Sequence, residues 1–118
     1  MIVAILFIHF VADFVVQTGW QAANKSKKLR ALAAHVGTYS MCFAPLVFWS
    51  KGSALWFVVN IAAHFLTDAI TSRFSSKFWR DGKPGKAFWI MIGFDQFIHG
   101  ATLTGTWLWL VERSQHAY

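Results

Sequence analysis

Three aspartates are each paired with a histidine four residues away, inside otherwise apolar segments of the sequence. The pairs are His9/Asp13, His64/Asp68 and Asp95/His99. One helical turn separates the members of a pair, so both side chains lie on the same face of a helix. An aspartate alone at bilayer depth costs roughly 3 kcal/mol, and three of them, each matched with an imidazole, need a physical reason. A buried site for a polyvalent metal ion is the hypothesis that the spacing favours.

The composition is that of an integral membrane protein. Hydrophobic residues make up 56% of the 118 residues and charged residues only 14%, which is about half the charged share of a soluble domain. A membrane-crossing helix needs about 20 residues, and four apolar stretches have about this length: 1–20, 32–49, 53–72 and 87–111. We therefore predict one all-α domain over residues 1–118, a four-helix transmembrane bundle. A very hydrophobic soluble four-helix protein is the alternative.

Lysine and arginine are distributed unequally along the chain. Four lie between the first and second stretches and five between the third and fourth, whereas Lys51 and Arg113 are the two on the other side. This positive-inside bias predicts two basic cytoplasmic loops and places both termini outside, in the periplasm, for a protein of the bacterial inner membrane. The basic loops are expected to contact anionic lipid headgroups, and no nucleic-acid partner is expected.

The predicted topology brings polar residues from all four helices to one depth. Counted from the cytoplasmic ends at 1.5 Å per residue, they fall within one slab about 12 Å thick. Seven residues form this set of predicted metal ligands: His9, Asp13, His35, His64, Asp68, Asp95 and His99. Of these, Asp13, Asp68 and Asp95 are also candidate general bases, and His35 is a candidate ligand or proton shuttle.

The ligand types indicate which metal is expected. Imidazole with carboxylate, and no thiolate, suits zinc first, with manganese or iron as other possibilities. Cys42 is the single cysteine, which excludes a cysteine-rich site and an intrachain disulfide. Seven ligands exceed the three or four that one zinc takes, so one or two ions are expected, with a two-metal centre favoured. Histidine–aspartate hydrogen bonds without metal, or a proton relay, are the alternatives.

The expected function is that of a metal-dependent hydrolase in the cytoplasmic leaflet, acting on an anionic, phosphate-containing amphiphile. Lys25 and Arg73 lie at the predicted cytoplasmic mouth and are expected to bind the anionic head of the substrate. Gln17 and Gln96 are expected to contact the substrate or to orient the ligands. Membrane lipids are the expected surroundings, and a homo-oligomer is possible.

Two non-hydrolytic functions compete with this hypothesis. The same residues would suit a divalent-cation or proton path, or a small phage-type regulator of a host membrane protein. Four histidines on four helices would also suit a b-type cytochrome. Aspartates one turn from the histidines argue against the cytochrome, and the scarcity of polar residues in the outer half argues against a transport path.

The chain resembles a family of small bacterial and bacteriophage membrane proteins catalogued as a domain of unknown function. The resemblance rests on HFVADFVVQ followed by NKSK, then His35, the HFLTD stretch and the DQFIH stretch, and it covers nearly the whole chain. It implies the four-helix membrane architecture and no particular activity. A looser likeness, on H-x-x-x-D spacing alone, is to bacterial inner-membrane metal-dependent hydrolases.

Overall fold

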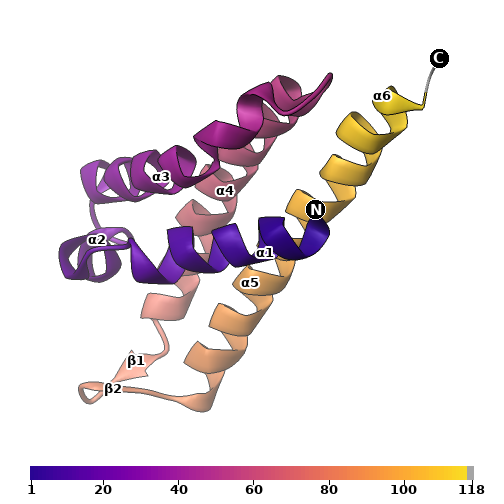
Figure 1. The fold of residues 1–118 in the computed structure, drawn as a ribbon. Coiled ribbons are helices and arrows are strands. Elements are labelled where there is room, and N and C mark those ends of the chain that lie inside the picture. The colour runs from indigo at the N-terminus through magenta and orange to yellow at the C-terminus, as the bar shows by residue number, and fades with distance from the viewer. Residues whose placement is uncertain (117–118) are drawn as a thin grey trace.

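The computed structural model describes residues 1–116 and is built almost entirely from helices (Figure 1). Four helical segments make up the fold. The first is α1 (Ile2–Phe10), which continues as the π-helix η1 (Val11–Val15), and the second is α3 (Leu29–Phe43), which continues as the 3-10 helix η2 (Ala44–Phe48). The third is α4 (Ser53–Ser76). The fourth is α5 (Lys86–Thr106), which continues as the π-helix η3 (Trp107–Glu112) and then as α6 (Arg113–Gln115). The helices α4 and α5 run side by side, and α1 crosses α5 (Figure 1).

Two short elements connect these segments. Helix α2 (Gly19–Asn24) lies between η1 and α3, and the hairpin of β1 (Trp79–Arg80) and β2 (Lys83–Pro84) joins α4 to α5. The two hairpin turn residues, Asp81 and Gly82, both have positive φ, which is the backbone of the type I′ turn that asparagine or aspartate followed by glycine favours.

The turn between η2 and α4 requires a glycine. Gly52 has a φ of +88°, and a Cβ placed on it would lie 2.1 Å from the carbonyl oxygen of Leu110. Because Gly52 has no side chain, this turn packs directly against the backbone of η3. This contact holds the start of α4 against the end of the long α5–η3 helix.

The apolar core lies where α3, α4 and the α5–η3 helix meet. Trp56 and Trp107 are both buried and pack edge to face, with ring centroids 5.0 Å apart. The Trp56 indole donates a hydrogen bond of 3.0 Å to the carbonyl of Leu103, so its one polar atom has a partner. Phe43 packs against Trp56 from α3. We call this region the tryptophan end.

The predicted first helix, residues 1–20, is wrong at its C-terminal part. The helix ends at Val15, and a new helix begins after Thr18. Thr18 and Gln21 form a capping box: each side chain accepts a hydrogen bond of 3.2 Å from the backbone N–H of the other residue. The other three predicted stretches correspond to helical segments whose ends differ by up to four residues, as where α4 continues to Ser76 and the last segment to Gln115.

Among the described residues, two helical segments are long and apolar enough to cross a membrane. They are Leu29–Phe48 and Ser53–Ser76. The segment Ile2–Val15 is apolar but shorter.

Candidate metal centre

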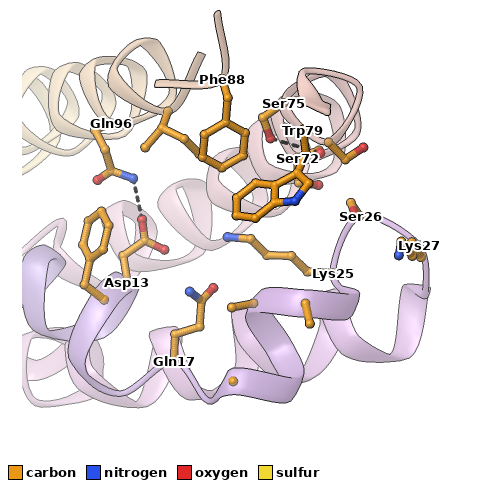
Figure 2. A pocket seen from close by; sticks show the side chains of 16 residues that line it. Asp13, Gln17, Lys25, Ser26, Lys27, Ser72, Ser75, Trp79, Phe88 and Gln96 are labelled. Atoms are coloured by element: carbon orange, nitrogen blue, oxygen red, sulfur yellow. Dashed lines mark hydrogen bonds between the residues drawn. The ribbon is translucent and has the colours of Figure 1, made fainter. Parts of the chain in front are cut away.

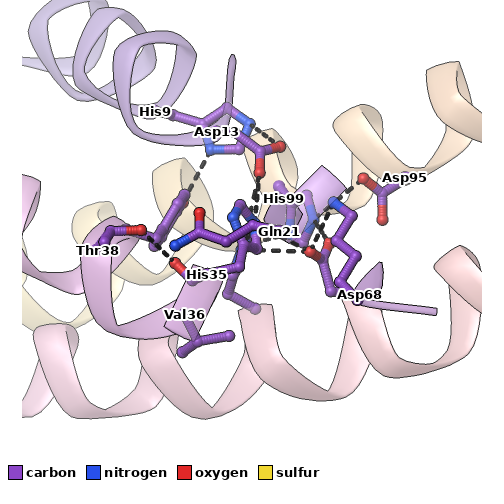
Figure 3. Close-up of polar contacts among 12 residues, drawn as sticks. His9, Asp13, Gln21, His35, Val36, Thr38, Asp68, Asp95 and His99 are labelled. Atoms are coloured by element: carbon purple, nitrogen blue, oxygen red, sulfur yellow. Dashed lines mark hydrogen bonds and ion pairs between the residues drawn. The ribbon is translucent and has the colours of Figure 1, made fainter. Parts of the chain in front are cut away.

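Six of the seven predicted ligands lie together in the interior, where η1, α3, α4 and α5 meet (Figure 3). Each has at most 6% of its surface exposed. We call these six residues the His/Asp cluster: Asp13, His35, His64, Asp68, Asp95 and His99. They form two groups, each of which is able to hold a metal ion, and Asp13 belongs to both.

The first group has the dimensions of a tetrahedral metal site. His35 Nε2 lies 3.0 Å from Asp13 Oδ1, 3.1 Å from Asp68 Oδ2 and 3.2 Å from His64 Nε2. His64 Nε2 lies 3.9 Å from the same Asp13 oxygen and 3.7 Å from the same Asp68 oxygen. Ligands about 2.0–2.2 Å from a tetrahedral ion are about 3.4 Å apart, and these five distances bracket that value.

Hydrogens and acceptors are not evenly matched in this group. The ring nitrogen His35 Nε2 carries at most one hydrogen, yet the carboxylate oxygens Asp13 Oδ1 and Asp68 Oδ2 both lie within 3.1 Å of it. The Lys25 ammonium also lies 3.2 Å from Asp68 Oδ2, so one hydrogen-bonded arrangement is available without a metal. Oxygen and nitrogen atoms that converge in this way would equally suit a cation.

The second group consists of Asp13, Asp95 and His99. His99 Nε2 lies 3.2 Å from Asp95 Oδ2 and 3.0 Å from Asp68 Oδ1, so it links the two groups. The amide of Gln96 donates to both carboxylates, at 2.7 Å to Asp13 Oδ2 and 3.1 Å to Asp95 Oδ2. Thr71 donates a hydrogen bond to the other Asp95 oxygen.

His9, a predicted ligand, lies beside the two groups and belongs to neither. Its Nε2 faces the Gln96 carbonyl oxygen at 2.7 Å, and its Nδ1 faces the Tyr39 hydroxyl at 2.8 Å. Asp13 is 3.9 Å from His9 Nε2. Both ring nitrogens are thus engaged in hydrogen bonds, and His9 acts on the cluster through Gln96.

Lys25 reaches the cluster, which the sequence did not predict. Its ammonium nitrogen lies 3.2 Å from Asp68 Oδ2. The sequence analysis placed Lys25 at the cytoplasmic mouth, but the bend after Val15 and the short helix α2 direct its side chain inward. Asp68 therefore faces one ammonium group and three imidazoles.

A cavity of about 770 Å³ opens beside the cluster (Figure 2). Asp13, Gln17, Lys25 and Gln96 line it, so three of the four predicted substrate contacts are there. Its walls combine hydroxyl groups with aromatic and aliphatic side chains: Ser72, Ser75, Ser76, Phe14, Trp79, Phe88 and Ile92. Arg73, the fourth predicted contact, is not among the lining residues. It donates instead to the carbonyl of Ala69 on its own helix.

A family model described as "Protein of unknown function (DUF3307)" matches residues 1–117. The chain belongs to this family. No curated protein and no solved structure matches it significantly. For this DUF3307 chain, the geometry of the cluster and its cavity is therefore the basis on which a function can be proposed.

Tyr39 is the residue of the DUF3307 site that the sequence analysis missed. Its ring stacks on that of His64, with centroids 3.7 Å apart and planes 10° apart, while its hydroxyl contacts His9. The signal was present, because Tyr39 follows His35 by one helical turn and shares its face. It orients two of the histidines at once.

Proposed function

We propose that this chain is a membrane-embedded, metal-dependent hydrolase that acts on an anionic, phosphate-containing amphiphile from the cytoplasmic leaflet. One observation carries the proposal: Asp13 belongs to a set of four residues whose candidate ligand atoms lie within 4.8 Å of one another, and it also lines a cavity with lysine and aromatic side chains in its walls. A ligand that faces a cavity is the arrangement by which a metal site reaches a substrate.

The exposed apolar surface supports the membrane part of the proposal. Large apolar side chains of every long helical segment are exposed, among them Val3 at 80%, Met41 at 74%, Phe48 at 92% and Phe97 at 71%. Soluble monomers seldom expose contiguous apolar surface of this kind, whereas lipid tails would cover it. The segment Lys86–Gln115 forms a continuous helical path and is long enough to be a third crossing helix.

The first segment is the shortest of the four proposed membrane segments. Ile2–Val15 has 14 residues and reaches about 21 Å, against about 30 Å for the hydrocarbon layer. We propose that it lies within the apolar layer against α3 and α5. The basic residues around α2 and the hairpin then face the cytoplasm, and both termini lie toward the outer side.

The cavity walls suit an amphiphile with an anionic head. Lys25 lines the cavity with an ammonium group, and Ser72 and Ser75 line it with hydroxyl groups. Trp79 and Phe88 also line it, and an acyl or prenyl chain would pack on their rings. A volume of about 770 Å³ falls within the range of about 300–1,000 Å³ that is common for small-molecule sites.

The residues divide into three roles. Asp13, His35, His64 and Asp68 hold a divalent ion, with zinc, manganese or iron fitting two imidazoles and two carboxylates. When bound, such an ion supplies an activated water and polarises the scissile phosphoryl group. Asp95 lies outside the first group, so its carboxylate is available as a general base when one ion is bound or as a ligand of a second ion, and Lys25 positions the anionic head.

The geometry gives little support to the two competing functions. His64 contacts both His35 and His99 directly, with ring centroids 5.2 Å and 4.3 Å apart, so no porphyrin plane fits between these imidazoles. A transport path would have to continue through the tryptophan end, which Trp56, Trp107 and Phe43 fill with closely packed apolar side chains.

The proposal is tested by metal content and phosphate release. Protein from metal-supplemented cells, purified in detergent, should carry a transition metal by elemental mass spectrometry, and should release phosphate from lysophosphatidic or phosphatidic acid in mixed micelles. His64→Ala and Asp68→Asn should lose both properties, whereas His116→Ala and Asp81→Asn, which alter exposed residues, should retain them. Circular dichroism should show unchanged helical content. Metal-free wild-type protein, or turnover that survives complete metal removal, would overturn the proposal.

A further inference from the structure

We infer that a second divalent cation binds between Asp13, Asp95 and His99, and that it binds together with the phosphate group of the substrate. This inference rests on the proposed function, because it assumes that the first group holds an ion. It adds a second binding site, an order of binding and a reason for the position of Gln96.

The second group has its ligands in place. A ligand atom from each of the three residues lies within 4.8 Å of the others, and all three side chains are buried. The Asp13 carboxylate is shared with the first group: its Oδ1 lies 3.0 Å from His35 Nε2, and its Oδ2 accepts a hydrogen bond from Gln96. A carboxylate shared between two ligand sets is the bridging element of two-metal hydrolytic sites.

The side-chain amide of Gln96 lies between the carboxylates of Asp13 and Asp95. Its amide nitrogen donates to Asp13 Oδ2 and to Asp95 Oδ2, which is the position that a cation bound by both would take. Rotating the amide by half a turn would present its oxygen to such a cation. The nitrogen would then donate to His9 Nε2, provided that the His9 hydrogen is on Nδ1, next to the Tyr39 hydroxyl.

The substrate can reach the second group through Asp13 and Gln96. Asp13, which both groups share, and Gln96, which donates to both carboxylates of the second group, line the cavity, whereas the other five candidate ligands do not. Figure 2 shows the Gln96–Asp13 hydrogen bond at the cavity wall, with the Lys25 side chain extending beside it. A phosphate bound near Lys25 would therefore lie beside the Asp13 carboxylate that the two positions share.

The charge of the cluster sets the order of binding. The three buried aspartates carry three negative charges, and Lys25 supplies one positive charge. Among residues 1–116, Lys25 is the one lysine or arginine that forms an ion pair with any of these aspartates. One divalent ion brings the total to zero when the imidazoles are neutral. A second ion would leave two buried positive charges, which a low-dielectric interior disfavours strongly. A phosphate dianion cancels them, so the second ion and the anion should bind together.

The experiment measures bound Mn²⁺ with and without inorganic phosphate. Detergent-purified protein is stripped with a chelator, re-equilibrated with Mn²⁺ by dialysis, and analysed by elemental mass spectrometry and electron paramagnetic resonance. We expect one ion per chain without phosphate, and two spin-coupled ions with it. The apparent affinity for the second ion should rise at least about tenfold on adding phosphate, which corresponds to about 1.4 kcal/mol of coupling.

Asp95→Asn is the diagnostic variant, with Asp81→Asn in the exposed hairpin turn as its matched control. Asp95→Asn should bind one ion under both conditions, and the control should behave as the wild type. One ion in the wild type regardless of phosphate, or two ions without phosphate, would overturn the inference and leave the proposed function standing. Loss of both ions from folded Asp95→Asn would also overturn it, since the sites would not be separate. Absence of any ion from the wild type would instead overturn the proposed function.

Discussion

The tryptophan end and the His/Asp cluster are built on the same two helices and have opposite properties. Helix α4 carries Trp56, Asn60, His64 and Asp68 at four-residue intervals, and all four are buried. The α5–η3 helix likewise carries Asp95, His99, Leu103 and Trp107 at four-residue intervals. One continuous helix–helix contact therefore changes from apolar to ionisable along its length.

Hydrogen bonding differs between the two regions. At the tryptophan end, Trp56 donates to the Leu103 carbonyl, and Asn60 donates to the Trp56 carbonyl and to Thr106. Among the described residues, the buried side-chain atoms without a hydrogen bond are all in or beside the cluster: Asp13 Oδ1, Gln17 Oε1, His35 Nδ1 and Ser72 Oγ. The polar side chains of the tryptophan end are hydrogen-bonded, whereas the cluster gathers ligand atoms that could hold a cation.

We expect the tryptophan end to determine the stability of the fold and the His/Asp cluster to determine its function. Packing at the tryptophan end stabilises the bundle, whereas the cluster buries three carboxylates whose desolvation has to be offset by Lys25 and the histidines. Buried ionisable groups gathered in this way are typical of sites that serve binding or catalysis. Changes at the tryptophan end should therefore affect the folded fraction, and changes in the cluster should affect metal binding and turnover.

The largest effect is expected from Trp56→Ala. Removing a fully buried indole leaves a cavity between α3, α4 and η3 and leaves the Leu103 carbonyl without its donor, for a loss of about 3–5 kcal/mol. Thermal unfolding in detergent, followed by circular dichroism, measures the loss. Trp109→Ala, at a side chain that is 63% exposed, is the matched control and should shift the midpoint far less. Equal shifts for both would mean that the tryptophan end does not stabilise the fold.

Metal removal should have the next largest effect. An ion that binds only the folded cluster stabilises it by about 2.7 kcal/mol at a free concentration 100 times its Kd. Chelation should therefore lower the unfolding midpoint of the wild type and leave that of Asp68→Asn unchanged. Identical chelator effects on both proteins would show that the stabilising ion binds elsewhere.

Asp13→Asn should destabilise the fold more with metal than without it. In the chelated protein the variant removes a buried carboxylate whose Oδ1 lies 3.0 Å from His35 Nε2 and whose Oδ2 accepts a hydrogen bond from Gln96, so about 2 kcal/mol of stability should be lost. With metal present a ligand is lost as well, and the loss of stability should be larger. Unfolding midpoints measured with chelator and with Mn²⁺ give the two losses, and Asp81→Asn should change neither midpoint. Equal losses in the two conditions would indicate that Asp13 is not a ligand of the stabilising ion.

Lys25→Met is predicted to weaken substrate binding. The variant keeps the aliphatic length and removes the ammonium group that faces the cavity, so KM should rise about tenfold with a smaller change in kcat. Lys28→Met, at an exposed residue, is the control. A fall in kcat with unchanged KM would mean that Lys25 acts on Asp68 and does not bind the substrate.

Spacing and depth were enough to predict which residues meet, because both follow from regular helix geometry. Four-residue intervals fix the shared face, and the apolar stretches fix the depth. Six of the seven predicted ligands accordingly lie in the two groups. Residue spacing and depth do not specify how a helix is rotated about its axis or which hydrogen bonds an imidazole ring makes. The sequence therefore could not show that His9 lies outside the two groups of candidate ligands.

The break after Val15 had a sequence signal that the apolar pattern obscured. Thr18-x-x-Gln21 is a capping-box pattern, and it starts a new helix within the stretch predicted as continuous. The consequence is functional, since this break allows Lys25 to reach Asp68. Long-range contacts of this kind depend on a change of chain direction, which local propensities do not specify.

The smallest effect is expected from Arg73→Gln, at a residue that the sequence had placed at the substrate. Ser72 and Ser76 of α4 line the cavity, and Arg73 lies about 100° around the helix from Ser72, where its guanidinium donates to the Ala69 carbonyl. Removing an exposed charge outside the cavity should change KM by less than about twofold. The measurement is the ratio of the KM changes for Arg73→Gln and Lys25→Met in the same micelles. A ratio near one would mean that the anionic head spans both sides of α4, and the cavity beside Asp13 would then no longer define the substrate position.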